Sequence, residues 1–130
     1  MILIDYLGLV APSRRRDNRQ QEVADISRDL KIMAKELNVP VIALAQLNRE
    51  VEKREKKVPQ LADLRDSSAM EQDADVVVFI YRGDLHEPDG DQATRLIIAK
   101  QRNGPLGEVR LAFQKKYARF ANLAHGYHYE

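Results

Sequence analysis

The chain has 130 residues, of which 44% are hydrophobic and 32% are charged, and its formal net charge is +1. A chain of this size buries one modest core, so we expect a single domain over residues 1–130. No apolar run approaches the roughly 20 residues that span a bilayer, and no signal segment precedes the first apolar run, which favours a cytoplasmic location without a membrane partner. The sequence contains no cysteine, which excludes disulfides and thiolate metal sites.

The first apolar run is Met1–Ile4, which leads directly into Asp5. A continuous apolar run predicts a strand that is buried on both faces of a parallel sheet. Asp5 would then lie at the carboxyl end of the strand, where open α/β sheets bind their ligands. In nucleotide-binding folds this pattern is the Walker B arrangement, whose aspartate helps to hold the Mg²⁺ of a bound triphosphate. The strand alone is equally consistent with an aspartate that caps a loop.

A loop and then a long amphipathic helix are expected after the first strand. Asp17 or Asn18 can cap the helix, because a short side-chain oxygen accepts a hydrogen bond from a first-turn amide. Apolar residues recur at steps of three and four from Val23 to Leu37, and the helix is expected to end at Asn38. The loop carries a basic cluster, which is typical either of a phosphate-binding surface or of a solvated face: Arg14, Arg15, Arg16 and Arg19.

A second short apolar run, Val41–Ala45, follows the helix and ends at Gln46. A strand, a helix and a strand form a βαβ unit, whose right-handed crossover makes the two strands parallel. Asp5 and Gln46 are therefore expected at the same edge of one sheet. At that edge Gln46 would position a water molecule or contact a phosphate, or would simply end the strand.

The second half of the chain is predicted to contain short helices and several strands. Residues 47–57 begin as a helix and continue as a loop, and residues 61–74 form one or two short helices. Residues 75–81, DVVVFIY, are β-branched, aromatic or apolar after the first position, which predicts a strand at or near the centre of the sheet. A polar turn follows at residues 83–91. Three further strands are expected at residues 95–99, 109–113 and 119–122, the second antiparallel to the first because their connection is short.

Two cations, Lys100 and Arg102, follow the strand predicted at residues 95–99. Two residues apart on an extended segment, they would point to the same side and contact one phosphate group together, or else be surface cations. The three histidines lack metal-ligand spacing, and the carboxylates are scattered without a pair suited to acid–base chemistry. The phosphate-binding motif GxxxxGK followed by serine or threonine is absent from the sequence.

Four segments in order along the chain resemble the C-terminal half of the motor domain of DnaB-type replicative DNA helicases. ILIDYLGL, at residues 2–9, resembles the Walker B segment of that family. The helix, strand and glutamine that follow the Walker B segment in the family resemble EVADISRDLKIMAKELNVPVIALAQLNR. DLRDSSAMEQDADVVVFIYR resembles the DNA-contacting loop and the next core strand, and AKQRNGPLGEVRLAF resembles the segment with the arginine finger. The resemblance implies a partial RecA-like α/β fold, with parallel strands, a crossover helix and an antiparallel C-terminal hairpin.

The resemblance also implies roles for individual residues. Asp5 would hold Mg²⁺–ATP through a coordinated water shell, and Gln46 would sense the γ-phosphate and link its state to the DNA-binding loops. Arg102 would be the arginine finger, with Lys100 beside it, and would reach the nucleotide of a neighbouring subunit in a hexameric ring. An arginine supplied in this way stabilises the charge that develops on the transferred phosphoryl group.

Single-stranded DNA is the other partner that the resemblance implies, together with identical subunits and other replication proteins. Arg65, Asp66 and Ser68 fall in the loop that holds the DNA backbone, although family members usually read arginine, glutamate, serine and glycine where this chain has RDSS. The basic loop lies where the family has a second loop that faces the channel. Its candidate DNA contacts are Arg15, Arg16 and Arg19.

Several elements of the family's motor would precede residue 1, namely the phosphate-binding loop, the catalytic glutamate and the N-terminal domain. We therefore expect this chain alone neither to bind ATP tightly nor to hydrolyse it. In the family, the strand that leads into the phosphate loop lies between the strands of Ile42 and Val77. Without that strand, the edges of the two flanking strands are expected to pair directly with each other, or the gap between them to be filled by dimerisation or strand exchange.

Two other functions remain open from the sequence. One is another RecA-like ATPase, of the recombinase or circadian-clock type, against which the extended match through KQRNGP argues. The other is a non-catalytic module that binds DNA or helicase subunits.

Overall fold

The structure is a computed structural model that describes residues 1–82 and 93–122. The polar turn predicted at residues 83–91 lies outside this part of the chain, as do His86, His125 and His128. The chain divides into two units, Met1–Asp75 and Val76–Glu130.

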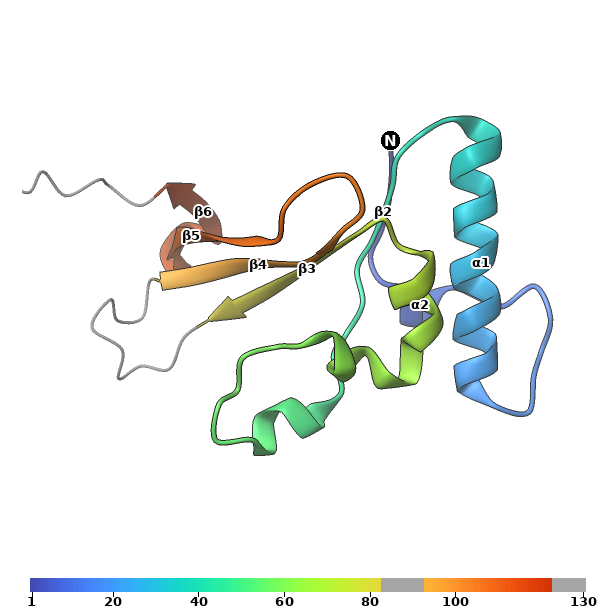
Figure 1. The fold of residues 1–130 in the computed structure, drawn as a ribbon, viewed down its shortest axis with the longest axis horizontal. Coiled ribbons are helices and arrows are strands. Elements are labelled where there is room, and N and C mark those ends of the chain that lie inside the picture. Colours follow the sequence, from blue (N-terminus) through green and yellow to red (C-terminus); the bar gives the residue numbers. More distant parts are fainter. Residues whose placement is uncertain (83–92, 123–130) are drawn as a thin grey trace, which may run out of the picture. The chain divides into compact units, whose positions relative to one another are not determined.

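The first unit is built around a parallel strand pair joined by a helix. Strands β1 (Ile2–Ile4) and β2 (Val41–Ala43) are parallel, with Ile4 opposite Ala43, and helix α1 (Arg19–Leu37) connects them (Figure 1). The pairing extends beyond the strands, because the Leu44 amide donates to the Ile4 carbonyl and the Leu44 carbonyl accepts from the Leu7 amide, each at 2.9 Å. The predicted βαβ unit is confirmed.

Helix α1 begins and ends at the residues that the sequence indicates. Oδ1 of Asn18 accepts a hydrogen bond from the Gln20 amide at 2.8 Å, and Asn38 adopts a left-handed conformation with φ 50° and ψ 46°. Asparagine tolerates this conformation better than most residues, which suits it to end a helix. The helix buries Ile26, which is 3% exposed, and Ser27, whose hydroxyl donates to Asp73 at 2.8 Å.

Replacing Asn18 with alanine is expected to lower the free energy of unfolding by about 1 kcal/mol, because the Gln20 amide loses its side-chain acceptor. Urea denaturation followed by circular dichroism measures this change. Asp17→Ala is the matched control, since Asp17 is the neighbouring cap candidate and does not cap the helix. An equal loss of stability in both variants would contradict the assignment of the cap.

Short helices complete the first unit. Three are 3₁₀ helices: η1 (Leu7–Leu9), η2 (Arg49–Lys53) and η3 (Leu61–Ser67). The fourth is α2 (Ser68–Asp73), which confirms the prediction of short helices in residues 61–74. The predicted helical start of residues 47–57 is a 3₁₀ turn, which Asn48 caps by accepting from the Glu50 amide at 3.2 Å.

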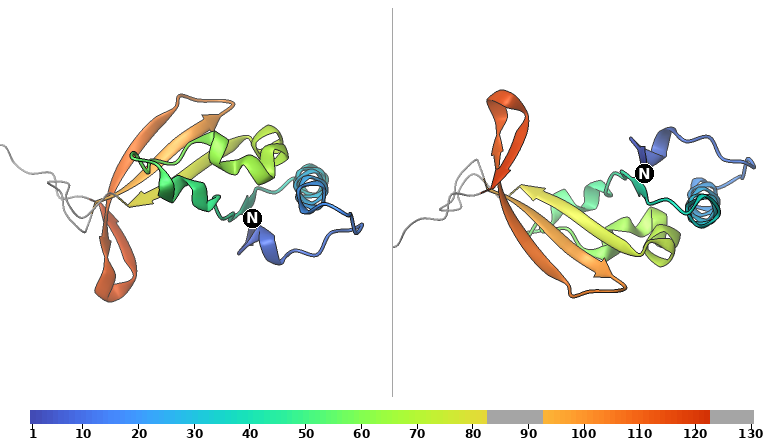
Figure 2. Two further views of the ribbon diagram at one scale, coloured as in Figure 1. Left: turned by 90° about the horizontal axis from the view of Figure 1, so that it is seen from below. Right: turned by 90° about the horizontal axis from the view of Figure 1, so that it is seen from above.

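The second unit contains an antiparallel sheet with the strand order β3-β4-β5-β6. Its strands are β3 (Val76–Arg82), β4 (Ala93–Gln101), β5 (Gly107–Gln114) and β6 (Arg119–Asn122), and a 3₁₀ turn, η5 (Lys115–Tyr117), joins the last two. Figure 2 shows the strong twist of this sheet, in which the β5–β6 hairpin turns away from the plane of β3 and β4. The predicted strands are confirmed, and the antiparallel arrangement includes four strands rather than one hairpin.

The position of the predicted central strand is wrong. In the part of the chain that the structure describes, β3 pairs only with β4 and is an edge strand. Strands β2 and β3 belong to separate sheets, so the direct pairing of these two edges is not formed. Each strand of the second sheet instead pairs with its neighbour in sequence, as short connections favour.

The expectation that the apolar runs are buried on both faces is also wrong. Leu3 in β1 is 66% exposed and Ile42 in β2 is 48% exposed. In β3, Phe79 is 4% exposed whereas the adjacent Val78 and Ile80 are 46% and 58% exposed. Side chains alternate between the two faces of a strand, so a continuous apolar run covers one buried face without showing that the other is buried. Within residues 1–82 and 93–122, no helix is long and apolar enough to cross a membrane.

Candidate functional site

Asp5 and Gln46 follow two adjacent parallel strands and lie at the same edge of the β1–β2 sheet. The backbone fixes this arrangement, because Asp5 lies between Ile4 and Leu7, which both bond to the backbone of Leu44, and Gln46 lies two residues beyond Leu44. Both side chains are exposed. A carboxylate and an amide are thus presented to solvent from neighbouring backbone positions.

This edge supplies only one carboxylate for a metal ion. Among the described residues, no group of three or more histidine, cysteine, aspartate or glutamate side chains is placed to hold a metal. Mg²⁺ commonly takes one or two protein carboxylates and keeps phosphate oxygens and water as its other ligands. Asp5 therefore fits an ion that is held mainly by a triphosphate and by water, and does not fit a metal site made by this chain alone.

Lys100 and Arg102 belong to the second unit and lie at the end of β4. Lys100 is opposite Val77, next to a bulge between Val77 and Val78. The strand ends at Gln101, and Arg102 is an exposed residue of the following turn. The two residues therefore do not share one extended segment, and the alternation on which the same-side prediction depended stops before Arg102.

The basic loop is held against helix α1 by carboxylates of the helix. Nε of Arg16 contacts Asp25 at 2.9 Å, and the Arg19 guanidinium contacts Glu22 at 3.1 Å and the Gly8 carbonyl at 3.0 Å. By contrast, no hydrogen bond or ion pair to another described residue holds the exposed Arg15. Of the three candidate DNA contacts in this loop, only Arg15 makes no direct contact with a carboxylate, although its charge contributes to the lowered pKa of Glu22.

The same contacts change the acidity of Glu22. The hydrogen bond from the Arg19 side chain, with a second from the Arg16 backbone amide, lowers the pKa of Glu22 below its ordinary value. Hydrogen bonds to the charged form of a carboxyl favour that form. Glu22 therefore stays ionised to lower pH than a free glutamate.

Arg19→Gln is expected to raise the pKa of Glu22 towards its ordinary value, because the largest cause of the lowered pKa is removed. A carbon-detected NMR titration of the glutamate side chains measures this shift. Arg14→Gln is a suitable control, since it removes an arginine from the same loop without removing a contact to Glu22. An unchanged Glu22 pKa in Arg19→Gln would contradict the observed contact.

The segment predicted to bind DNA lies where η3 meets α2. Arg65 and Asp66 lie in η3, and Ser68 begins α2. Leu64, immediately before them, departs from helical geometry with φ −80° and ψ 20°, so the backbone bends at this point. The backbone thus changes direction between Asp63 and the start of α2.

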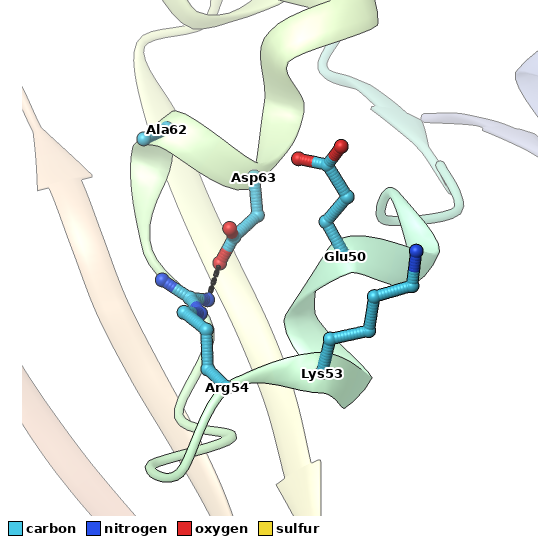
Figure 3. A pocket seen from close by; sticks show the side chains of 5 residues that line it. All are labelled: Glu50, Lys53, Arg54, Ala62 and Asp63. Carbon is cyan, nitrogen blue, oxygen red and sulfur yellow. Dashed lines mark hydrogen bonds and ion pairs between the residues drawn. The ribbon is translucent and has the colours of Figure 1, made fainter.

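The ion pair of Arg54 with Asp63, next to this bend, was not predicted from the sequence. Nη2 of Arg54 contacts Asp63 at 2.5 Å, beside a pocket of about 410 Å³ whose lining Figure 3 shows: Glu50, Lys53, Arg54, Ala62 and Asp63. The nine-residue separation between Arg54 and Asp63 corresponds to no helix or strand repeat, so spacing gives no signal for the pair. The Asp63 side chain is 10% exposed and the Arg54 side chain is 35% exposed, so the carboxylate is largely shielded from water and the guanidinium is partly shielded.

Comparison with known proteins places this arrangement in a family. Residues 1–122 match the DnaB-like helicase C terminal domain. In alignments of 126 residues that cover 95% of the chain, it is 57% identical to the replicative DNA helicase DnaC of Bacillus subtilis and 56% identical to the replicative DNA helicase DnaB of Geobacillus stearothermophilus. The chain spans 28% of the length of each of these relatives.

Solved structures give the same result for the fold. The chain is similar to the ATPase domain of G40P, with a TM-score of 0.87 and 50% identity, over 94% of this chain and 44% of that one. It is also similar to a DnaB-like replicative helicase described with its interactions with primase, with a TM-score of 0.88 and 51% identity, over 94% of this chain and 30% of that one. The chain belongs to the DnaB-like helicase C-terminal domain family.

Proposed function

We propose that the chain is part of the RecA-like ATPase domain of a ring-forming replicative helicase, which couples ATP hydrolysis to movement along single-stranded DNA and to duplex unwinding. The observation that supports this proposal is the shared sheet edge of Asp5 and Gln46, from which a carboxylate and an amide would contact one nucleotide. Asp5 would hold the water shell of Mg²⁺–ATP, and Gln46 would contact the γ-phosphate. The bound Mg²⁺ would neutralise charge on the phosphates during transfer.

In the same proposal, the cations of the second unit act on a neighbouring subunit. Arg102 is exposed in the turn after β4, where a guanidinium is accessible to another chain, and Lys100 is close to it in sequence. Guanidinium groups suit the planar recognition of phosphate oxygens. A ring of identical subunits, six in the proposed assembly, would bring each Arg102 to the nucleotide of the adjacent subunit.

The DNA-binding role is proposed for Arg65, Asp66 and Ser68 and for the basic loop. In the loop, Arg15 is the strongest candidate because Arg16 and Arg19 already contact carboxylates of α1. Contacts to the DNA backbone do not read the base sequence, so we expect DNA binding with little sequence preference. A similar helicase structure is described with its interactions with primase, and we propose primase as a further partner.

A chimera tests the proposal. The matched 126 residues of the Geobacillus stearothermophilus helicase are replaced with this chain, and ATPase activity is measured with and without single-stranded DNA. We expect the chimera to hydrolyse ATP with stimulation by DNA, whereas the 130-residue chain alone, which lacks the GxxxxGK motif, shows no activity. A folded, ring-forming chimera without ATPase activity would overturn the proposed function.

A further inference from the structure

We propose that Asp63 is a positioning residue for single-stranded DNA binding, which fixes the backbone that leads into the segment of Arg65, Asp66 and Ser68. This inference rests on the proposed function for the role of the DNA, but not for the structural claim about the segment. Asp63 would not touch DNA itself, because its carboxylate is already used within the chain. It acts on the segment that begins two residues later.

The Asp63 carboxylate joins two parts of the chain. Oδ2 accepts from Nη2 of Arg54 at 2.5 Å and from the backbone amide of Gln60 at 2.7 Å (Figure 3 shows the Arg54 contact). The Arg54 guanidinium also donates to the Val58 carbonyl at 3.4 Å. The carboxylate therefore closes the loop between η2 and η3 at both of its ends.

The backbone of Asp63 makes a third connection. Its carbonyl accepts from the amide of Asn48 at 3.3 Å, and Asn48 lies two residues after Gln46. The backbone two residues after Gln46, the proposed γ-phosphate contact, is thus bonded to Asp63, which lies two residues before the proposed DNA-binding segment. A displacement of Gln46 would reach the segment through one hydrogen bond and a few residues of backbone.

The burial of Asp63 favours the one backbone arrangement in which its carboxylate keeps its hydrogen bonds. Asp63 is 10% exposed at its side chain, and Val51 and Leu64 are each 8% exposed. A charged hydrogen bond that is shielded from water is stronger than an exposed one, and an unpaired buried charge is costly. The bend at Leu64 lies within η3 and directly follows this anchored residue, so the anchor would fix the direction of the chain through the rest of η3.

The Lys31–Asp75 ion pair provides a matched control. Its atoms are also 2.5 Å apart, it lies in the same unit, and it connects α1 to the end of the unit rather than to η3. Lys31→Met therefore removes an ion pair of the same length from the same unit without changing the DNA-binding segment. Because the Asp75 side chain is 59% exposed, whereas that of Asp63 is 10% exposed, the smaller loss of stability expected in Lys31→Met is measured alongside. Arg54→Met is the second test variant, because it removes the partner of Asp63 and keeps the Gln60 contact.

The first measurement is the mobility of the segment in the 130-residue chain. Because the chain has no cysteine, Ser67→Cys carries a single nitroxide label, and its electron paramagnetic resonance spectrum reports local motion without DNA. We expect Asp63→Asn and Arg54→Met to increase the mobility of the label and Lys31→Met to leave it unchanged. Unchanged mobility in both test variants, or an equal increase in Lys31→Met, would overturn the proposal.

The second measurement is the affinity of the unlabelled chain for a fluorescent oligo-dT over a series of salt concentrations. Asp63→Asn is expected to weaken binding about tenfold, the factor that corresponds to one charge-assisted hydrogen bond. It should also reduce the slope of affinity against salt, since phosphate contacts are lost. An equal loss in Lys31→Met would contradict the positioning role. If the wild-type chain does not bind the oligonucleotide, DNA binding by this chain fails, while the label still tests the positioning claim.

Discussion

Arg102→Ala in the chimera is expected to lower kcat for ATP hydrolysis by a factor of about 10³ to 10⁵, the range known for arginines that stabilise phosphoryl transfer from a neighbouring chain. The reason is the loss of a guanidinium at the point where charge develops on the γ-phosphate. Steady-state ATPase kinetics with saturating single-stranded DNA measure this change. Arg110→Ala is the control, because Arg110 lies on β5 and contacts Glu108 at 3.8 Å.

Mixed rings determine whether Arg102 acts on its own subunit or on the next one. A subunit with Asp5→Asn keeps its Arg102, and a subunit with Arg102→Ala keeps its Asp5. If Arg102 acts on the neighbour, mixing the two variants creates some sites with both residues, and activity rises above that of either variant alone. If activity does not rise in rings that contain both variants, the proposed action across subunits is wrong.

Asp5→Asn is expected to lower kcat by about 10² to 10³, since the amide holds the water shell of Mg²⁺ less well and metal stabilisation of the transferring phosphoryl group accounts for several kcal/mol. The protein fold should be unaffected, because Asp5 is exposed at the end of β1. Raising the concentration of Mg²⁺ should restore part of the activity.

Asp17→Asn is the control for this substitution, as it makes the same chemical change at an exposed position in the basic loop. A chimera with Asp5→Asn that retains normal kcat would contradict the role proposed for Asp5. The same result would also leave the shared edge of Asp5 and Gln46 without a function in hydrolysis.

Local signals in the sequence were sufficient for the elements of the fold. The cap at Asn18, the left-handed end at Asn38 and the parallel pairing of β1 with β2 all follow from side-chain chemistry and periodicity within short windows. The edge position of β3 does not follow, because strand order depends on which strands meet in space. The exposure of Leu3 likewise depends on what covers each face, and an apolar run does not encode this.

The candidate site was predicted less completely than the fold. Asp5 and Gln46 were placed correctly at one edge because parallel pairing fixes where strand ends meet. The contacts of Arg16 with Asp25 and of Arg54 with Asp63 were missed, since each joins residues nine apart and one partner of each pair lies in a loop or at its end. Their formation depends on the path of that loop, which neither helical nor strand periodicity determines.

The two sheets place different demands on the order of folding. Each strand from β3 to β6 pairs with its neighbour in sequence, whereas Ile2 in β1 must find Val41 across the whole of α1. Contacts between residues far apart in sequence require more loop closure and form later than local ones. We expect the antiparallel sheet to form first and the edge with Asp5 and Gln46 to form last. During refolding of this chain, the pairing of β1 with β2 would then lag behind the recovery of the antiparallel strands.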